Sequence, residues 1–170
     1  MGGNQSNGSG IYIQLDQPFF YAGQNVTGKV HLCIVQPYPA RFLYFKIIGK
    51  EKTHWVTQRT ETYTAKDNEG KDVIRTRTIP EPHRGETVIF NSLAPLITMP
   101  NIFPPGQYSI PFSMNIPSYF PGTFEIDHVD DGFAHIKQVS IRYKVIATLE
   151  SLSTGTCSSL KYKIPLKIRP

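Results

Sequence analysis

The segment from residue 160 to residue 169 carries basic side chains at alternate positions, and these side chains could bind anions. Lys161, Lys163, Lys167 and Arg169 interleave with Leu160, Tyr162, Ile164, Leu166 and Ile168. Ammonium and guanidinium groups pair with phosphate oxygens, so the stripe could meet lipid headgroups or phosphorylated tails. The alternative, which the pattern favours, is the solvated face of an edge strand whose lysines prevent edge-to-edge association. The four residues are our candidate surface for an acidic partner or headgroup.

The first residues carry a candidate lipidation site. Met1-Gly2-Gly3-Asn4-Gln5-Ser6 fits the M-G-x-x-x-[ST] pattern for myristoylation of Gly2. Residues 1–10 have no side chain that could anchor them, so we predict a flexible tail that exposes the lipid. One myristoyl chain gives only marginal membrane binding, and a second signal would be needed. The alternative is a flexible tail without a lipid.

A loop rich in Asp and Gly supplies donors that suit a hard cation. Asp127, His128, Asp130 and Asp131 lie close together, but their spacing matches no EF-hand. Acidic loops are usually just solvated. We expect no metal and no cofactor.

Catalysis needs a nucleophile with a base in reach and a third group that orients the base. The histidines are scattered, and no GxSxG, HExxH or phosphate-cradling glycine loop lies near them. Cys33 and Cys157 are expected to be small packing residues. The sequence predicts a protein that is not an enzyme and has no catalytic residue.

Nucleic-acid binding is also disfavoured. The formal charge of +5 is mild for 170 residues, and no concentrated basic face is evident. The group Arg75, Arg77, His83 and Arg84 is expected to be solvated, since its two halves need not converge. Trp55 and the tyrosines near it fit core and cross-strand aromatics better than a base-stacking platform.

Composition points to one all-β domain in the cytoplasm. Fourteen Pro, thirteen Gly, nine Tyr and ten Phe favour short strands separated by turns. The chain has no apolar run long enough to span a bilayer and no secretory signal. Its two cysteines, Cys33 and Cys157, are too few and too far apart in the sequence to indicate a disulfide framework. We predict a flexible tail at residues 1–10 and one domain at residues 11–170, cytoplasmic and peripheral at the plasma membrane or endosomes if lipidated.

Alternation of apolar and polar residues predicts the strands. A first strand begins at Ile11, and a second has Val26, Gly28, Val30, Leu32 and Ile34 on one face. Residues 42–48 are apolar on both faces, apart from Lys46, and suggest a central strand covered on both sides. Residues 107–116 alternate strictly, and Pro111 among them must lie at an edge or a bulge because it has no N–H. Further strands are predicted over residues 139–149 and 160–168.

The middle of the chain predicts a polar hairpin. Residues 53–79 are rich in Thr, Tyr, Val and Ile, and Asp67-Asn68-Glu69-Gly70 divides them with turn-forming residues. A separate short strand is predicted at Thr87-Val88-Ile89-Phe90, followed by a proline-rich loop to Gly106. Many short strands with turns between them predict a sandwich or barrel.

Four ordered segments resemble the N-terminal domain of the arrestin family. They are residues 21–30 (YAGQNVTGKV), 45–50 with Trp55 (FKIIGK), 103–124 with its Pro-Gly and Pro-Phe series, and 139–145 (VSIRYKV). The resemblance implies an immunoglobulin-like antiparallel β-sandwich. Receptor arrestins carry adjacent phosphate-sensing lysines in the first strand, whereas residues 11–15 here read IYIQL. The match therefore looks closer to the arrestin-domain-containing, or α-arrestin, branch.

The resemblance implies a non-enzymatic adaptor that binds cytosolic tails of membrane proteins and links them to trafficking machinery. The alternative is a structural subunit of a membrane coat, like the arrestin-fold subunit of retromer. The sequence contains no PPxY motif, so a link to ubiquitin ligases is not implied. The family normally has a second sandwich domain, and this chain is either a fragment or a single-domain relative.

Overall fold

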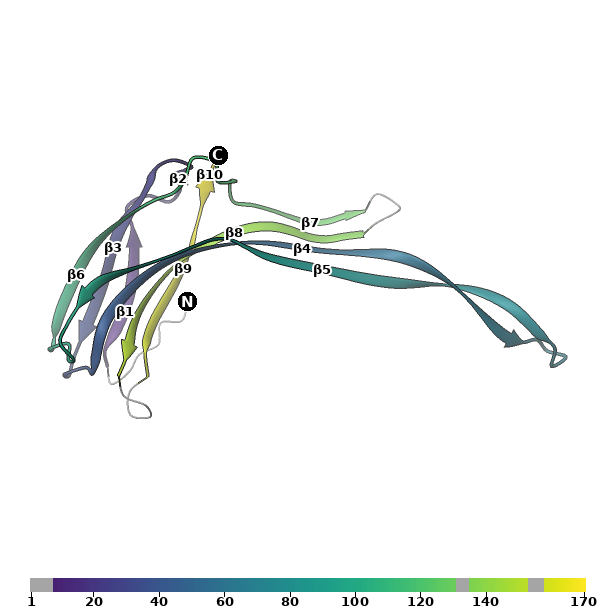
Figure 1. Ribbon diagram of the computed structural model, residues 1–170, viewed down its shortest axis with the longest axis horizontal. Coiled ribbons are helices and arrows are strands. Elements are labelled where there is room, and N and C mark those ends of the chain that lie inside the picture. The colour runs from purple at the N-terminus through teal and green to yellow at the C-terminus, as the bar shows by residue number, and fades with distance from the viewer. Residues whose placement is uncertain (1–7, 131–134, 153–157) are drawn as a thin grey trace. The chain divides into compact units, whose positions relative to one another are not determined.

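The computed structural model describes residues 8–130, 135–152 and 158–170, and its regular elements are all strands (Figure 1). In chain order they are β1 (Gly10–Leu15), β2 (Phe20–Tyr21), β3 (Asn25–Ile34), β4 (Ala40–Lys66), β5 (Asp72–Thr98), β6 (Gly106–Asn115), β7 (Phe124–Asp130), β8 (His135–Ser151), β9 (Leu160–Leu166) and β10 (Ile168–Arg169). The predicted all-β fold is confirmed. In the described part of the chain, no helix is long and apolar enough to cross a membrane.

The strands form two compact units. The sandwich unit comprises Met1–Lys50, Val88–Phe124 and Ile141–Pro170, and the ribbon unit comprises Glu51–Thr87 and Glu125–Ser140. The long strands β4, β5 and β8 contribute residues to both units. The predicted limits of a single domain at residues 11–170 stay a prediction.

The first sheet of the sandwich unit has the order β1-β3-β6, with both pairs antiparallel. Val26, Val30, Leu32 and Ile34 of β3 are buried, as their alternation predicts, because successive side chains of a strand point to opposite faces. Gly28 shares this face, where a side chain would collide with the Gln14 carbonyl oxygen of β1 and with Phe112. These contacts explain the glycine in the V-x-G-x-V pattern.

The second layer of the sandwich unit is built from the sandwich parts of β5, β4 and β8, in that order, with β9 paired to β8 (Figure 1). The two layers enclose one hydrophobic core. At its centre the Phe45 ring of β4 stacks on the Phe112 ring of β6, with centroids 4.1 Å apart. Among residues 42–48 of β4, Leu43, Phe45 and Ile47 are fully buried, whereas residues 42, 44, 46 and 48 are half-buried. The strand is central, between β5 and β8, as predicted, but its outer face is covered only in part.

A two-stranded parallel sheet closes one end of the sandwich. In it Ile168 of β10 pairs with Phe20 of β2, and both side chains are buried. The Ile168 N–H donates to the Thr123 hydroxyl at 2.9 Å. The segment from residue 160 to residue 169, predicted as one strand, is therefore two strands that join different partners.

The ribbon unit contains the outer parts of β4 and β5 and their connecting turn. The Asp67 carboxylate accepts hydrogen bonds from the backbone N–H groups of Glu69 and Lys71, both at 2.9 Å, and Gly70 has φ +79°. The predicted turn is confirmed, but its hairpin is far longer than residues 53–79. The separate strand predicted at residues 87–90 belongs to β5, which continues through residues assigned to a loop. Strand β7 was likewise predicted to be part of a loop.

Candidate binding surfaces

The structure divides the predicted basic stripe. Lys161 and Lys163 are exposed on β9, whereas Arg169 lies on β10 and Lys167 between the two strands. The Arg169 guanidinium lies 3.8 Å from the centre of the Phe19 ring, a cation–π contact that ties it to the residue before β2. Because β9 pairs with β8 and β10 with β2, the four cations do not form one continuous row. Only Lys161 and Lys163 share an exposed sheet face.

Several predicted site residues lie outside the described part of the chain. Gly2, Cys157 and Asp131 belong to residues that the structure does not describe, and the side chains of His128 and Asp130 are also not described. Myristoylation of Gly2 therefore stays a prediction. Among the described residues there is no group of three or more His, Cys, Asp and Glu that could hold a metal ion.

The basic group on β5 does not converge. The Arg77 guanidinium forms an ion pair with Glu61 at 2.8 Å and lies over the Tyr63 ring. His83 accepts or donates a 2.8 Å hydrogen bond with the Thr57 hydroxyl and stacks on Trp55. Arg77 and His83 are six positions apart on an extended strand, a distance of about 20 Å. Both residues are used in cross-strand pairs, as expected for a solvated ribbon. Trp55 is a cross-strand aromatic and is 37% exposed, so it is not a core residue.

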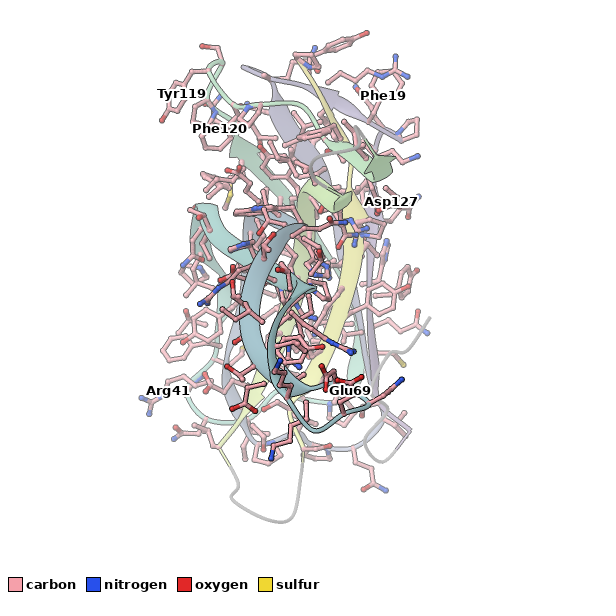
Figure 2. The ribbon with its side chains drawn as sticks, turned by 90° about the vertical axis from the view of Figure 1, so that its right-hand side faces the viewer. Phe19, Arg41, Glu69, Tyr119, Phe120 and Asp127 are labelled. Carbon is pink, nitrogen blue, oxygen red and sulfur yellow. The ribbon has the colours of Figure 1, made fainter. Side chains whose placement is uncertain are left out.

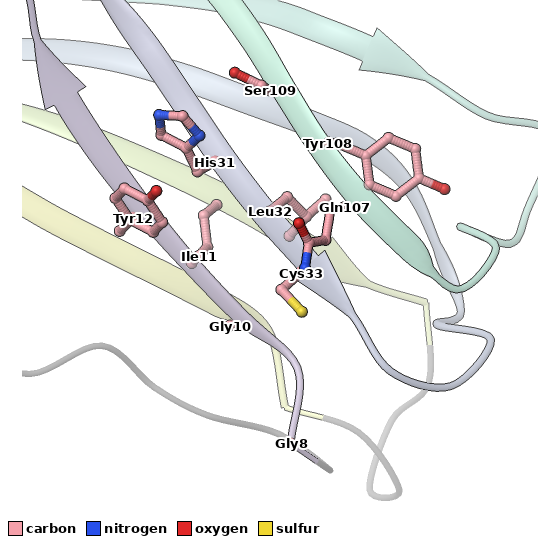
Figure 3. Close-up of a pocket in the computed structure, with 10 residues that line it drawn as sticks. All are labelled: Gly8, Gly10, Ile11, Tyr12, His31, Leu32, Cys33, Gln107, Tyr108 and Ser109. Atoms are coloured by element: carbon pink, nitrogen blue, oxygen red, sulfur yellow. The ribbon is translucent and has the colours of Figure 1, made fainter.

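A hollow of about 700 Å³ lies on the outer face of the β1-β3-β6 sheet (Figure 3). On its floor the Tyr12 ring stacks on the His31 ring, with centroids 4.4 Å apart, because the two residues are register partners. The His31 Nε2 atom lies 3.2 Å from the Gln14 side-chain oxygen. Cys33, expected to be a packing residue, is instead exposed at the rim of this hollow. The hollow offers amide, imidazole, hydroxyl and thiol groups as a polar contact surface.

The edges of the two sheets differ in their capacity to accept another strand. Within the described residues of the sandwich unit, β6, β5 and β9 are edge strands that contain Pro111, Pro95 and Pro165. The predicted edge position of Pro111 is confirmed. A proline removes a backbone donor and so hinders pairing at an edge. The fourth edge strand, β1, contains no proline and runs beside β9.

Backbone geometry shows which groups of β1 point away from its partner. The Asp16 N–H donates to the Thr27 carbonyl oxygen at 3.1 Å. In an antiparallel pair these bonds occur at every second residue, so the N–H groups of Ile11, Ile13 and Leu15 point away from β3. They form a row of donors along the proline-free edge. The sequence does not directly indicate that β1 is an edge strand with outward backbone donors, because edge position depends on the order of the strands in the sheet.

The buried tyrosine Tyr143 stabilises the fold of the sandwich unit. Tyr143 of β8 is 1% exposed, and its hydroxyl donates to the Pro121 carbonyl oxygen at 2.8 Å. Burial disfavours the charged phenolate and raises the pKa of Tyr143 to about 12. The aromatic cluster around it includes Phe120, which packs edge-on against Tyr119 (Figure 2). This cluster secures the loop before β7, and Tyr119 itself is 81% exposed.

Comparison with known proteins identifies the fold. The chain is 30% identical over 140 residues to arrestin domain-containing protein A of Dictyostelium discoideum, which covers 82% of this chain and 23% of that protein. The chain thus spans about a quarter of this relative. The crystal structure of the sporulation control protein Spo0M from Bacillus subtilis matches with a TM-score of 0.50 at 13% identity, over 95% of this chain and 49% of that one. This likeness supports the fold alone.

The family model of the N-terminal domain of arrestin (or S-antigen) matches residues 10–163, which include every strand from β1 to β8 and most of β9. The predicted resemblance, including that to arrestin-domain-containing proteins, is therefore confirmed. The chain belongs to the arrestin N-terminal domain family.

Proposed function

We propose that this chain is a non-enzymatic adaptor that binds cytosolic tails of membrane proteins through strand addition at β1. Membership of the arrestin N-terminal domain family supports the adaptor role. The observation that carries the binding mode is the proline-free edge of β1, where Ile11, Ile13 and Leu15 present backbone groups away from β3. Strand addition takes affinity from such groups and specificity from alternate side chains.

The outer face beside this edge can supply specificity. Tyr12 and Gln14 project from β1 to the same face as His31. Tyr12 and His31 line the hollow (Figure 3), and the Gln14 side-chain oxygen lies 3.2 Å from the His31 Nε2 atom. Side chains of an added strand would alternate in the same way, so every second one would meet this polar floor. A tail with hydroxyl or amide side chains at those positions fits best.

Site-directed cross-linking in host cells tests the binding mode. A photo-reactive phenylalanine placed at Tyr12 is expected to capture cytosolic tails of several membrane proteins. The matched control places it at Tyr119, a more exposed tyrosine of the same unit. Equal capture at both positions would contradict binding at β1, and capture of one constant soluble partner would favour a coat subunit.

A second variant probes the edge itself. Leu15→Pro removes a donor that points away from β3 and leaves the β1–β3 hydrogen bonds in place. It is expected to abolish capture at Tyr12 while the far-ultraviolet circular dichroism stays unchanged. Undiminished capture by a folded Leu15→Pro variant would argue against strand addition.

Myristoylation of Gly2 is the proposed route to a peripheral membrane location. Intact mass and membrane fractionation of the host-expressed protein, beside a Gly2→Ala variant, test it. A mass increase and a membrane fraction that both depend on Gly2 are expected. Identical partition of the two forms would leave recruitment to the partners alone.

A further inference from the structure

The charges of the chain are unevenly divided between its two units. The sandwich unit has ten Lys and Arg residues and only two carboxylates, Asp16 and Glu150, for a formal charge of +8. The ribbon unit has eight Lys and Arg residues and eleven Asp and Glu residues, for a charge of −3. The mild total of +5 therefore conceals a strongly basic sandwich.

Within the sandwich unit, the cations gather on one of the two outer faces. On the outer face of β1, β3 and β6 the only formally charged residue is Lys29. The outer face of β4, β8 and β9 has the following Lys and Arg residues by strand alternation: Lys46, Lys50, Arg142, Lys144, Lys161 and Lys163. The single carboxylate on that face is Glu150. We call the face of β4, β8 and β9 the basic sheet face.

Strand pairing brings four of these lysines close together. Lys161 and Lys163 lie opposite Thr148 and Ile146 of β8, and Lys144 is therefore the diagonal neighbour of Lys163. Diagonal neighbours on adjacent strands are about 7–8 Å apart. Lys46 and Lys161 line the same shallow hollow. The spacing of Lys144 and Lys163 is within the Debye length of about 10 Å at 0.1 M salt, and Lys161 lies two residues from Lys163 on the same strand, so these charges act together on a partner.

The four ammonium groups are also available to a partner. Lys144, Lys161 and Lys163 are exposed and Lys46 is half-buried. In the described part of the chain, none of the four forms an ion pair. Glu150, the single carboxylate on the face, offsets their mutual repulsion only in part, and a negative surface would relieve it further.

We propose that the basic sheet face docks on an anionic membrane surface. Apolar side chains lie among the lysines, since Tyr44, Leu93 and Ile146 line the same hollow. A membrane interface accepts this mixture, because lysine stems cover apolar surface while their ammonium groups reach the headgroups and tyrosine rings sit at headgroup level. The proposal goes beyond the adaptor role, because it assigns a second surface on a different sheet.

Two features favour a membrane over an acidic or phosphorylated peptide. Strands β4 and β8 each have a neighbour on both sides, so a peptide cannot add to them as a further strand. Glu150 lines the hollow together with Lys46 and Lys161, and its carboxylate would repel a single phosphate group held there. Lysine point charges spread over a flat face suit many headgroups better than one bidentate contact.

Vesicle flotation with the unlipidated 170-residue chain tests the proposal. The chain is expected to float with vesicles of phosphatidylcholine containing one third phosphatidylserine, and not with phosphatidylcholine alone. The triple variant Lys144→Gln, Lys161→Gln, Lys163→Gln is expected to lower the partition coefficient about 100-fold, because each basic residue near an anionic membrane contributes a factor of about 5. Binding should also be lost at 1 M NaCl, where the Debye length is about 3 Å.

The matched control is Lys29→Gln, Lys66→Gln, Lys71→Gln, which lowers the net charge equally at exposed positions off the basic sheet face. It should retain vesicle binding to within a few-fold. Equal loss in both variants would overturn the proposal, because net charge alone would explain binding. Absence of vesicle binding would also overturn it, and binding of a phosphoserine peptide that depends on Lys144, Lys161 and Lys163 would then assign the face to a peptide. Either failure leaves the capture of tails at Tyr12 untouched, so the two proposals fail separately.

Discussion

The sandwich unit and the ribbon unit hold their strands together by different forces. In the sandwich, side chains such as Phe45, Ile47 and Leu149 are at most 1% exposed, and the Phe45 ring stacks across the two layers on Phe112. In the described residues of the ribbon, Val56 is the one buried apolar side chain. Cross-strand pairs such as Arg77 with Glu61 and Trp55 with His83 take the place of a core. Burial thus maintains one unit and pairwise surface contacts the other.

Large-to-small substitutions should give the largest contrast. Phe45→Ala removes a ring that is 1% exposed and stacked on Phe112, and we expect a loss of about 3–5 kcal/mol in the free energy of unfolding. Trp55→Ala in the ribbon removes a half-exposed cross-strand ring and should cost about 1 kcal/mol. Urea unfolding followed by circular dichroism measures both. Equal losses would mean that the ribbon has a core of its own.

Glycine substitutions give the next contrast. A Cβ at residue 28 would lie 2.3 Å from the Gln14 carbonyl oxygen and 2.7 Å from Phe112, so Gly28→Ala must separate β1 from β3 or displace that ring. We expect a cost of about 3 kcal/mol. A Cβ at Gly70 would meet open space, so Gly70→Ala costs only the strain of an alanine at φ +79°, about 1 kcal/mol in the free energy of unfolding. Urea midpoints of the two variants provide the test, and a larger effect at Gly70 would contradict it.

Alkaline pH should weaken the sandwich through Tyr143. Its folded-state pKa of about 12 lies above the ordinary value of 10, because burial disfavours the phenolate. The contribution to stability is therefore complete below pH 10 and is lost as pH rises from 10 to 12. Tyr143→Phe should lower the free energy of unfolding by about 1 kcal/mol at neutral pH, because the Pro121 carbonyl loses its donor. Above pH 10 the free energy of unfolding of this variant should fall less steeply than that of the unchanged protein. The exposed Tyr119→Phe serves as control and should change neither.

The smallest effect should come from the ribbon's ion pair. Arg77→Ala removes the 2.8 Å contact with Glu61 and the stacking on Tyr63, and the loss should be about 0.5 kcal/mol, smaller at high salt. Amide hydrogen exchange should accelerate near residues 61 and 77 and stay unchanged in the sandwich. Because Trp55 is the only tryptophan, its fluorescence reports the ribbon directly. A shift in the sandwich's exchange rates would show that the two units unfold together.

Much of the sandwich was predictable from local patterns. The alternation of apolar and polar residues predicted which residues of β3 and β8 are buried, and the missing N–H of Pro111 predicted that its strand lies at an edge. Each of these signals depends only on a residue and its neighbours in the sequence. The turn at Asp67–Gly70 was predictable for the same reason. The family resemblance was visible in four short segments and is confirmed over residues 10–163.

The extent of β5 was not predictable in this way. Pro80, Pro82 and Gly85 look like strand breakers, yet all three lie within β5. A strand at the edge of a sheet tolerates prolines whose missing donors face away from its partner, and Pro80 and Pro82, two residues apart, point to the same side. Only Lys161 and Lys163 of the basic sheet face were predicted from the sequence, for a related reason. Its lysines come from β4, β8 and β9, and only the strand order brings them together.

The pairing of β10 with β2 has a consequence for how the protein is made. Phe20 is translated early, but its backbone N–H donates to the Lys167 carbonyl oxygen, and its register partner is Ile168. Closing so long a loop is entropically costly, and contacts of high sequence separation form slowly. On the ribosome, the pair β1–β3 can form as soon as it emerges, whereas the sandwich cannot close until residue 169 has left the exit tunnel. Until then the apolar face of the β1–β3 pair is exposed, and only chaperones or rapid completion of translation protect it from aggregation.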